Sequence, residues 1–155
     1  MTELSSKRKA AITASWAFVI ACLVIIFIYS NETASESTET SDGIIAKLLE
    51  LFNLNLSSGV VRSIAHCIEY AGLCFAFNLA FFSTYLRFCP LLSLISSVFY
   101  SATDEIHQFF VEGRACQIID LVIDASGAII TTFVLIIIYL IYKKYCSKRG
   151  KLCQY

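Results

Sequence analysis

The chain contains apolar runs that are longer than the core helices of a water-soluble domain. Two of them, at residues 12–29 and 118–142, reach the length of about 20 apolar residues that crosses a bilayer. Two more, at residues 64–82 and 91–107, come close to that length, and the latter is short and rich in serine. The sequence therefore predicts an all-α membrane protein, a bundle of about four transmembrane helices.

The overall composition supports this class. Hydrophobic residues make up 57% and charged residues 15% of the 155 residues, whereas soluble proteins average about 25% charged residues. The formal net charge is zero, which gives no reason to expect a nucleic-acid partner. The seven cysteines form no CxxC pair and have no histidine at zinc-ligand spacing. They are typical of small core residues, and we expect no cofactor, metal or disulfide framework.

Basic residues set the predicted orientation, because cytoplasmic segments of membrane proteins carry an excess of Lys and Arg. They precede the first run, separate the second from the third, and follow the fourth: Lys7, Arg8 and Lys9, then Arg87, then Lys143, Lys144, Lys148, Arg149 and Lys151. Four spans place all three groups on one side. We therefore expect a cytoplasmic N-terminus at residues 1–11, a membrane domain at 12–142 and a cytoplasmic tail at 143–155.

The connection after the first span, residues 30–61, is predicted to lie outside the cytoplasm. Its first part, residues 30–43, is acidic and rich in Ser and Thr, which favours a solvated, mobile loop. In residues 44–54 the apolar positions recur at helical spacing. Eleven residues are too few to span a bilayer, so we expect a short amphipathic helix that lies in the outer interface or caps the bundle.

On this topology the outer ends of three helices carry polar side chains. Arg62, His66 and Tyr70 are each four residues apart in the second helix and share one face, and Glu69 lies close to that face. In the third helix, residue 104 is expected to share a face with residues 107 and 108, while Glu105 points elsewhere.

Two glycines and two acids shape the start of the fourth helix. Gly113 supplies a permissive backbone in the turn before it, and Arg114 follows this turn. Asp120 and Asp124 then lie four residues apart, and Gly127 is expected to allow close packing against another helix.

An ionised side chain deep in lipid costs roughly 2.5–3.5 kcal/mol on insertion scales, so these groups should face inward and meet. The sequence thus predicts a polar pocket that opens outward. The residues expected at its mouth are Arg62, His66, Glu69, Tyr70, Asp104, Glu105, His107, Gln108, Arg114, Asp120 and Asp124. A structural alternative is that the same ion pairs and hydrogen bonds only hold the helices together.

Four of these residues are candidates for acid–base catalysis. His66 and His107 are of the residue type that titrates near neutral pH, and Asp104 or Asp124 could assist them. The same four could approach one metal ion, but no dense ligand motif such as HExxH is present.

The segment "DEIHQFFVEGRACQIIDLVIDASGAII", residues 104–130, resembles the VanZ-like family of bacterial membrane proteins. The segment "RSIAHCIEY", residues 62–70, is similar to that family's basic-x3-His-x3-Tyr element. The chain departs from the family pattern at Glu112, where a proline is usual, and at Thr131, where a glycine is frequent. The resemblance implies a place in the bacterial plasma membrane and a role in the cell envelope. Its founding member is associated with resistance to the glycopeptide teicoplanin.

Three functions remain open at this point. The pocket could bind a lipid head group or a lipid-anchored glycopeptide antibiotic, with Arg62 and Arg114 holding phosphate or carboxylate. It could instead belong to an enzyme that acts on a lipid-linked phosphate, or to a small transporter. The expected partners are membrane lipids, a lipid-linked envelope precursor or a lipoglycopeptide; the oligomeric state is left open.

Overall fold

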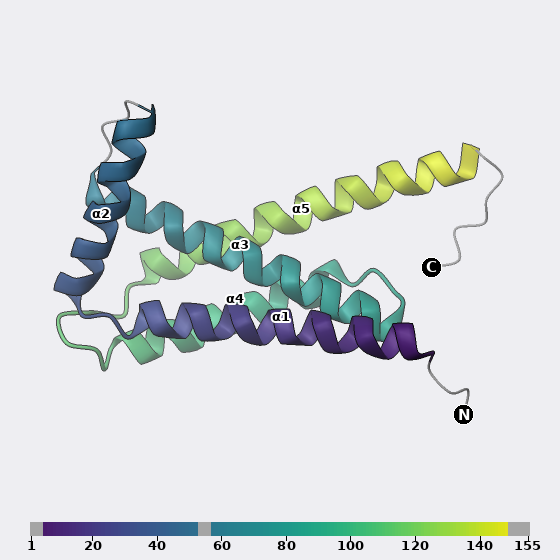
Figure 1. The fold of residues 1–155 in the computed structure, drawn as a ribbon, viewed down its shortest axis with the longest axis horizontal. Helices are drawn as coiled ribbons and strands as arrows, with labels where there is room; N and C mark the ends of the chain where they lie inside the picture. Colours follow the sequence, from purple (N-terminus) through teal and green to yellow (C-terminus); the bar gives the residue numbers. More distant parts are fainter. Residues whose placement is uncertain (1–4, 53–56, 149–155) are drawn as a thin grey trace.

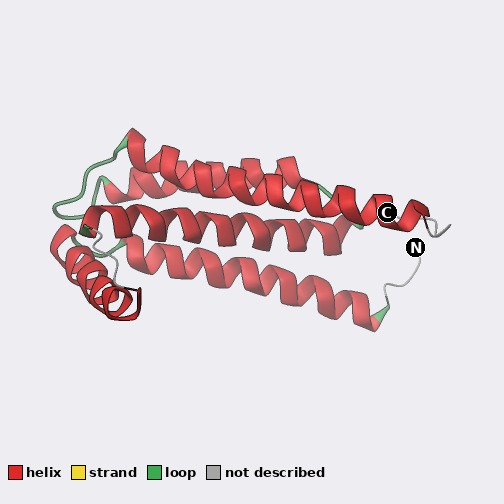
Figure 2. Ribbon diagram, turned by 90° about the horizontal axis from the view of Figure 1, so that it is seen from above, coloured by secondary structure: helices red, strands yellow, loops and turns green. Residues whose placement is uncertain are grey.

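The computed structural model describes residues 5–52 and 57–148, with side chains except at 41, 44–46, 48–52, 58 and 148. In these residues it contains five helices and no strand: α1 (Ser6–Ser30), α2 (Ala34–Phe52), α3 (Ser58–Tyr85), α4 (Pro90–Gln108) and α5 (Ile118–Lys148). Four helices run side by side along the long axis, whereas α2 lies across one end (Figures 1 and 2). The predicted all-α bundle is confirmed.

Three helices are long and apolar enough to cross a bilayer: Ser6–Ser30, Gly59–Tyr85 and Ile118–Ser147. The chain is therefore a multi-pass membrane protein. The fourth bundle helix, α4, has 19 residues, which corresponds to about 28 Å at 1.5 Å per residue. It packs along α3 and α5, so its neighbours cover part of a helix that is shorter and more polar than the other three.

The inner face of α4 is more polar than its outer face. On α4 most exposed side chains are apolar, as at Leu91, Ile95 and Phe99. The buried face of the same helix contains Ser93, Ser97, Ser101, Asp104, Glu105 and Gln108. This distribution suits a helix with one face toward lipid and the other toward polar groups of neighbouring helices. It also shows that Glu105 points inward, contrary to the sequence prediction.

Close helix packing depends on Gly127 in α5. A Cβ atom at this position would overlap the carbonyl oxygen of Cys67 in α3 and lie 2.9 Å from its carbonyl carbon. Only the absence of a side chain therefore lets the two backbones approach this closely, as in other membrane helix pairs. Next to this contact, Cys67 Sγ lies 3.8 Å from Ser126 Oγ.

The acidic stretch after α1 is helical, and the prediction of a mobile loop over residues 30–43 was wrong. The reason is a capping box at the start of α2. The Thr33 backbone N–H donates to Glu36 Oε2 at 2.8 Å, and the Glu36 N–H donates to Thr33 Oγ1 at 3.3 Å. The apolar positions expected for residues 44–54 lie outside the described side chains, although the backbone is helical to Phe52.

Most of the basic residues, among them Lys7, Arg87 and Lys143, belong to segments at one end of the bundle. The start of α1 and the end of α5 both lie at the end opposite α2 (Figure 1). Arg8 Nη2 donates to the Thr84 carbonyl oxygen at 3.0 Å, which joins α1 to the end of α3. The tail residues Arg149 and Lys151 lie outside the described residues. The opposite end carries the polar termini of α1, α3, α4 and α5.

Candidate functional site

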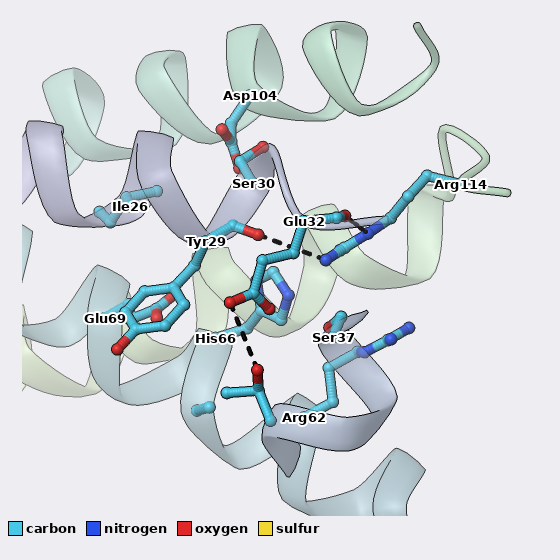
Figure 3. A pocket seen from close by; sticks show the side chains of 12 residues that line it. Ile26, Tyr29, Ser30, Glu32, Ser37, Arg62, His66, Glu69, Asp104 and Arg114 are labelled. Carbon is cyan, nitrogen blue, oxygen red and sulfur yellow. Dashed lines mark hydrogen bonds between the residues drawn. The ribbon is translucent and has the colours of Figure 1, made fainter. Parts of the chain in front are cut away.

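A pocket of about 160 Å³ opens at this polar end. Its walls come from the end of α1, the first turns of α2, the first half of α3, the end of α4 and the turn before α5 (Figure 3). The lining residues are Ile26, Tyr29, Ser30, Glu32, Ser37, Thr40, Arg62, Ala65, His66, Glu69, Asp104 and Arg114.

Arg114 ties the turn before α5 to two helices. Its Nε donates to the Glu32 carbonyl oxygen at 3.0 Å, and its Nη2 donates to the Tyr29 carbonyl oxygen at 3.3 Å. Its Nη1 donates to Gln108 Oε1 at 3.1 Å. Burial, and secondly the nearby charge of Arg62, lowers the pKa of Arg114. The chain reaches this position through Gly113, whose φ of 74° lies in the left-handed region that favours glycine.

The charged residues of the pocket are separated along its depth. Arg62 lies in the second turn of α3, near the mouth, and Figure 3 shows Arg62 and Arg114 on one side with Glu69 on the other. Glu69 follows Arg62 by seven residues, about 10 Å further into the bundle along the helix axis. Asp104 is four residues before the last residue of α4, about 6 Å from that end. The arginines thus lie outside the half-buried Glu69 and the buried Asp104.

Neither guanidinium group has a carboxylate partner among the described residues. Among the described residues, the one ion pair within 4.0 Å joins His66 and Asp124. The charge of Arg114 is held by two carbonyl groups and an amide. Arg62 is half-buried and makes no hydrogen bond to another described residue. Arg62 is therefore free to interact with an added anion, and Arg114 keeps the N–H groups that its three hydrogen bonds do not use.

A buried polar cluster lies next to the pocket and joins three helices. Ser101 Oγ donates to Asp124 Oδ2 at 2.7 Å, and Asp124 Oδ1 lies 3.4 Å from His66 Nδ1. The second contact has the length of an ion pair but lacks hydrogen-bond alignment. Asp124 is 1% exposed. His66 contacts the Asp124 carboxylate and also lines the pocket.

Asp104 and its neighbours form the inner wall. Gln108 Nε2 donates to Asp104 Oδ2 at 3.1 Å, and the same amide accepts from Arg114, so a short chain of polar groups runs from the mouth inward. Ser30 lies beside Asp104 in Figure 3. Tyr70 is fully buried, with its hydroxyl near Asp104 but outside hydrogen-bond geometry.

The structure does not bring every predicted residue into the pocket. His107 turns toward α1, where its Nε2 lies 3.1 Å from Asn31 Oδ1 and its ring centroid lies 5.1 Å from that of Phe27. Glu105 Oε2 accepts from the Gln117 backbone N–H at 3.0 Å and supports the turn into α5. Asp120 is half-buried in the first turn of α5 and does not line the pocket.

The rotation of α4 explains the misplacement of His107. The inward face follows Ser97 and Ser101, and residues three, four and seven positions after Ser101 continue it. His107 comes six positions after Ser101, about 120° away around the helix. Asp104 was a poor reference for this face. His107 and Gln108 lie at nearly the same angle from it, on either side of it around the helix, so spacing from Asp104 alone does not show which of them points inward.

No group of three or more His, Cys, Asp or Glu residues in the described ranges is arranged to hold a metal ion. The polar groups that line the pocket are two guanidinium groups, three carboxyl groups, one imidazole and several hydroxyl groups. Such groups can bind a small polar or charged ligand, and the imidazole can exchange a proton.

The model of the VanZ/LLP1 family matches residues 15–141. This range includes most of the chain, from the third turn of α1 to the second half of α5. The chain belongs to the VanZ/LLP1 family. A comparison with curated proteins gives no match, and neither does one with solved structures.

The VanZ/LLP1 region contains every residue that lines the pocket. At one of the two departures from the expected family pattern, Thr131 Oγ1 donates to the Ala71 carbonyl oxygen at 3.3 Å. The hydroxyl thus contacts the α3 backbone, where a glycine would leave only a backbone surface. At the other, Glu112 is exposed in the turn, and its carbonyl oxygen accepts from the Ala34 N–H at 3.4 Å.

Sequence reasoning missed the pocket residues of this VanZ/LLP1 protein that come from the end of α1 and the start of α2. The most important is Glu32, whose Oε1 accepts from Thr40 Oγ1 at 3.4 Å. A signal was available, because Glu32 follows the first apolar run directly and must lie at the same membrane level as the other polar ends. It was overlooked because residues 30–43 were treated as a mobile loop.

Proposed function

We propose that this VanZ/LLP1 protein binds the phosphate-bearing head group of a membrane lipid in its polar pocket. The observation that carries the proposal is the pair Arg62 and Arg114, which line one cavity with no carboxylate within 4.0 Å among the described residues. Guanidinium groups form strong, charge-assisted hydrogen bonds to phosphate oxygens. Two of them at one mouth form a suitable site for such a group.

The size of the pocket favours a head group over a whole antibiotic. Pockets for drug-sized ligands measure roughly 300–1,000 Å³, whereas this one measures about 160 Å³. A glycopeptide could place only a small anionic group in it. A role in resistance to lipid-anchored glycopeptides would then follow from recognition of that group or of the lipid that surrounds the antibiotic.

The proposed site faces the outside of a bacterial plasma membrane. Support comes from the basic residues at the other end of the bundle, such as Lys7, Arg87 and Lys143, since this charge bias is typical of cytoplasmic ends. Both termini would then be cytoplasmic. The pocket would lie at the level of the outer head groups, within reach of envelope lipids.

Arg62 offers the sharper test, because Arg114 also holds the turn before α5 in place. The purified protein in detergent is titrated with short-chain phosphatidylglycerol and phosphatidylethanolamine, and binding is measured by native mass spectrometry. A hydrogen bond between charged groups contributes about 1.5–3 kcal/mol. The Arg62→Gln variant should therefore bind roughly 10- to 100-fold more weakly.

The matched control is Arg87→Gln, which removes an exposed arginine at the opposite end of the bundle. It should keep the wild-type affinity. Failure of the wild-type protein to bind either lipid would overturn the proposal, as would equal losses in the Arg62→Gln and Arg87→Gln variants.

A second candidate function is catalysis on a lipid-linked phosphate, which the His66–Asp124 pair favours. Asp124 lies 3.4 Å from Nδ1 of His66, and His66 also lines the pocket. An imidazole that lies beside a buried carboxylate and faces a pocket is suited to act as a general base or acid. Incubation with lipid-linked diphosphates should then release phosphate or a new lipid, and the His66→Gln variant should form none. A broad lipid panel without turnover counts against catalysis.

A further inference from the structure

The charges of the pocket do not suit a purely anionic ligand. Its lining contains two guanidinium groups, from Arg62 and Arg114, and three carboxyl groups, from Glu32, Glu69 and Asp104. A phosphate held by the two guanidinium groups would leave the inner carboxyl groups, Glu69 and Asp104, without a partner on the ligand. Because opposite charges attract and like charges repel more strongly near a protein interior than in water, a second, cationic group on the ligand would pair with these carboxyl groups.

The positions of the charges give the ligand a direction. Arg62 and Arg114 lie near the mouth, while Glu69 lies about two helical turns deeper along α3. Asp104 is 4% exposed and also lies inward of the mouth. An anionic group therefore fits at the mouth, and a cationic group fits deeper, between Glu69 and Asp104.

We propose, on the basis of the head-group function above, that the ligand is amphoteric and carries a primary ammonium group close to its phosphate. The phosphate lies between Arg62 and Arg114. The ammonium group donates to Glu69, Asp104 and Ser30. A primary ammonium has three N–H donors, and these three residues supply a matching set of oxygen acceptors at the inner part of the pocket.

A quaternary ammonium, as in a choline head group, fits less well. It has no N–H to donate, and proteins usually bind it in a cage of aromatic rings. Among the described lining residues Tyr29 is the one Phe, Tyr or Trp, and its side chain is exposed. The pocket should therefore discriminate between a primary and a quaternary amine that carry the same phosphate.

The same chemistry has two sources. One is phosphatidylethanolamine of the surrounding bilayer, whose head group must bend back so that the amine enters first. The other is a water-soluble phosphate ester of ethanolamine, which can enter from outside in either direction. Both place an ammonium and a phosphate at similar separation, so an experiment must include each.

The test compares four probes with the full-length protein in detergent: short-chain phosphatidylethanolamine, phosphatidylglycerol and phosphatidylcholine, and soluble glycerophosphoethanolamine. We expect phosphatidylethanolamine to bind at least 10-fold more tightly than the other two lipids. Equal binding of the soluble ester would also support an amphoteric ligand and identify the aqueous phase as its source. Weak binding of the ester would identify the bilayer.

The Glu69→Gln variant should change the affinities for phosphatidylethanolamine and phosphatidylglycerol differently. Removing one carboxylate should weaken binding of phosphatidylethanolamine by about 10-fold and leave phosphatidylglycerol binding equal or tighter. Glu112→Gln, at an exposed carboxylate in the outer turn, should change neither affinity. Thermal unfolding of each variant reports whether it is folded, and the ranking of lipids by the wild-type protein stands as a test without any substitution.

The outcomes separate this inference from the function on which it rests. If phosphatidylglycerol binds as tightly as phosphatidylethanolamine and both depend on Arg62, the head-group function stands and the amphoteric ligand is wrong. A wild-type protein that prefers phosphatidylcholine would also refute it. If no phospholipid binds, the proposed function itself fails.

Discussion

The substitution Gly127→Ala should separate α5 from α3. The added Cβ would overlap the Cys67 carbonyl oxygen, lie 2.9 Å from its carbonyl carbon and lie 3.2 Å from the Ala71 nitrogen. Non-bonded carbon atoms pack at about 3.5–4.0 Å, so the helices have to move apart by roughly 1 Å. All three obstacles are backbone atoms, which cannot swing aside as the end of a flexible side chain can.

The expected cost follows from overpacking, which destabilises proteins by about 1–3 kcal/mol. A backbone obstacle places Gly127→Ala at the upper end of this range. The better helix propensity of alanine offsets at most about 1 kcal/mol, which leaves a net loss of about 2 kcal/mol. The site should respond too, because Asp124 lies one turn before Gly127 and its 3.4 Å contact with His66 joins the same two helices.

The matched control is Gly72→Ala in α3, where an added Cβ would meet nothing within 4 Å. The free energy of unfolding is measured by titration with dodecyl sulfate in mixed micelles, followed by circular dichroism. Gly72→Ala should be neutral or slightly stabilising, so the two variants should differ by about 2–3 kcal/mol. Equal stability of Gly127→Ala and the wild-type protein would refute the close contact of α3 with α5.

Two further predictions concern the polar end. Backbone and hydroxyl donation from Thr33 lowers the pKa of Glu36, so the capping box stabilises α2 above the ordinary pKa of a glutamate and loses this effect as the pH falls through the lowered value. Hydrogen exchange of the Thr33 amide should show the loss in the wild-type protein but not in Glu36→Gln, and a pH step shared by both would contradict it. Cys116, an exposed thiol in the turn before α5, should react with a membrane-impermeant maleimide added outside intact cells, whereas Cys116→Ser should lose this labelling. Labelling of Cys116 only after the cells are opened would reverse the proposed orientation.

The sequence was sufficient to predict three long apolar helices and the meeting of polar helix ends, whereas the span expected at residues 91–107 corresponds to α4, which is not among the three helices long and apolar enough to cross a bilayer. Both follow from one strong effect, the cost of placing ionised groups in lipid, which forces Arg62, Glu69, Asp104 and Asp124 toward the inside of the bundle. The family was also predicted correctly from the residues around these positions, and the match to residues 15–141 confirms it. Because this cost is large, a short chain has few helix arrangements that keep its ionised groups out of lipid.

The details that failed depend on much smaller energies. The inward face of α4 includes Glu105 and excludes His107, a difference of helix rotation that the row Ser93, Ser97 and Ser101 would have revealed. The helix at residues 34–43 was missed because composition was given more weight than the Thr33–Glu36 capping box. Local capping contributes about 1 kcal/mol, yet it decides where a polar segment becomes helical.

The polar face of α4 links the fold to the site. Lipid offers no hydrogen-bond partners to the serines, acids and amide on the inner face of α4. These side chains therefore find partners on other helices. Ser101 donates to Asp124 of α5, and Asn78 Nδ2 of α3 donates to Ser93 Oγ at 3.4 Å. Stable insertion of α4 therefore requires α3 and α5 to be in place, and their contacts also position Asp104 in the pocket. Any change that weakens this interface should loosen the binding site before the three longer spans leave the membrane.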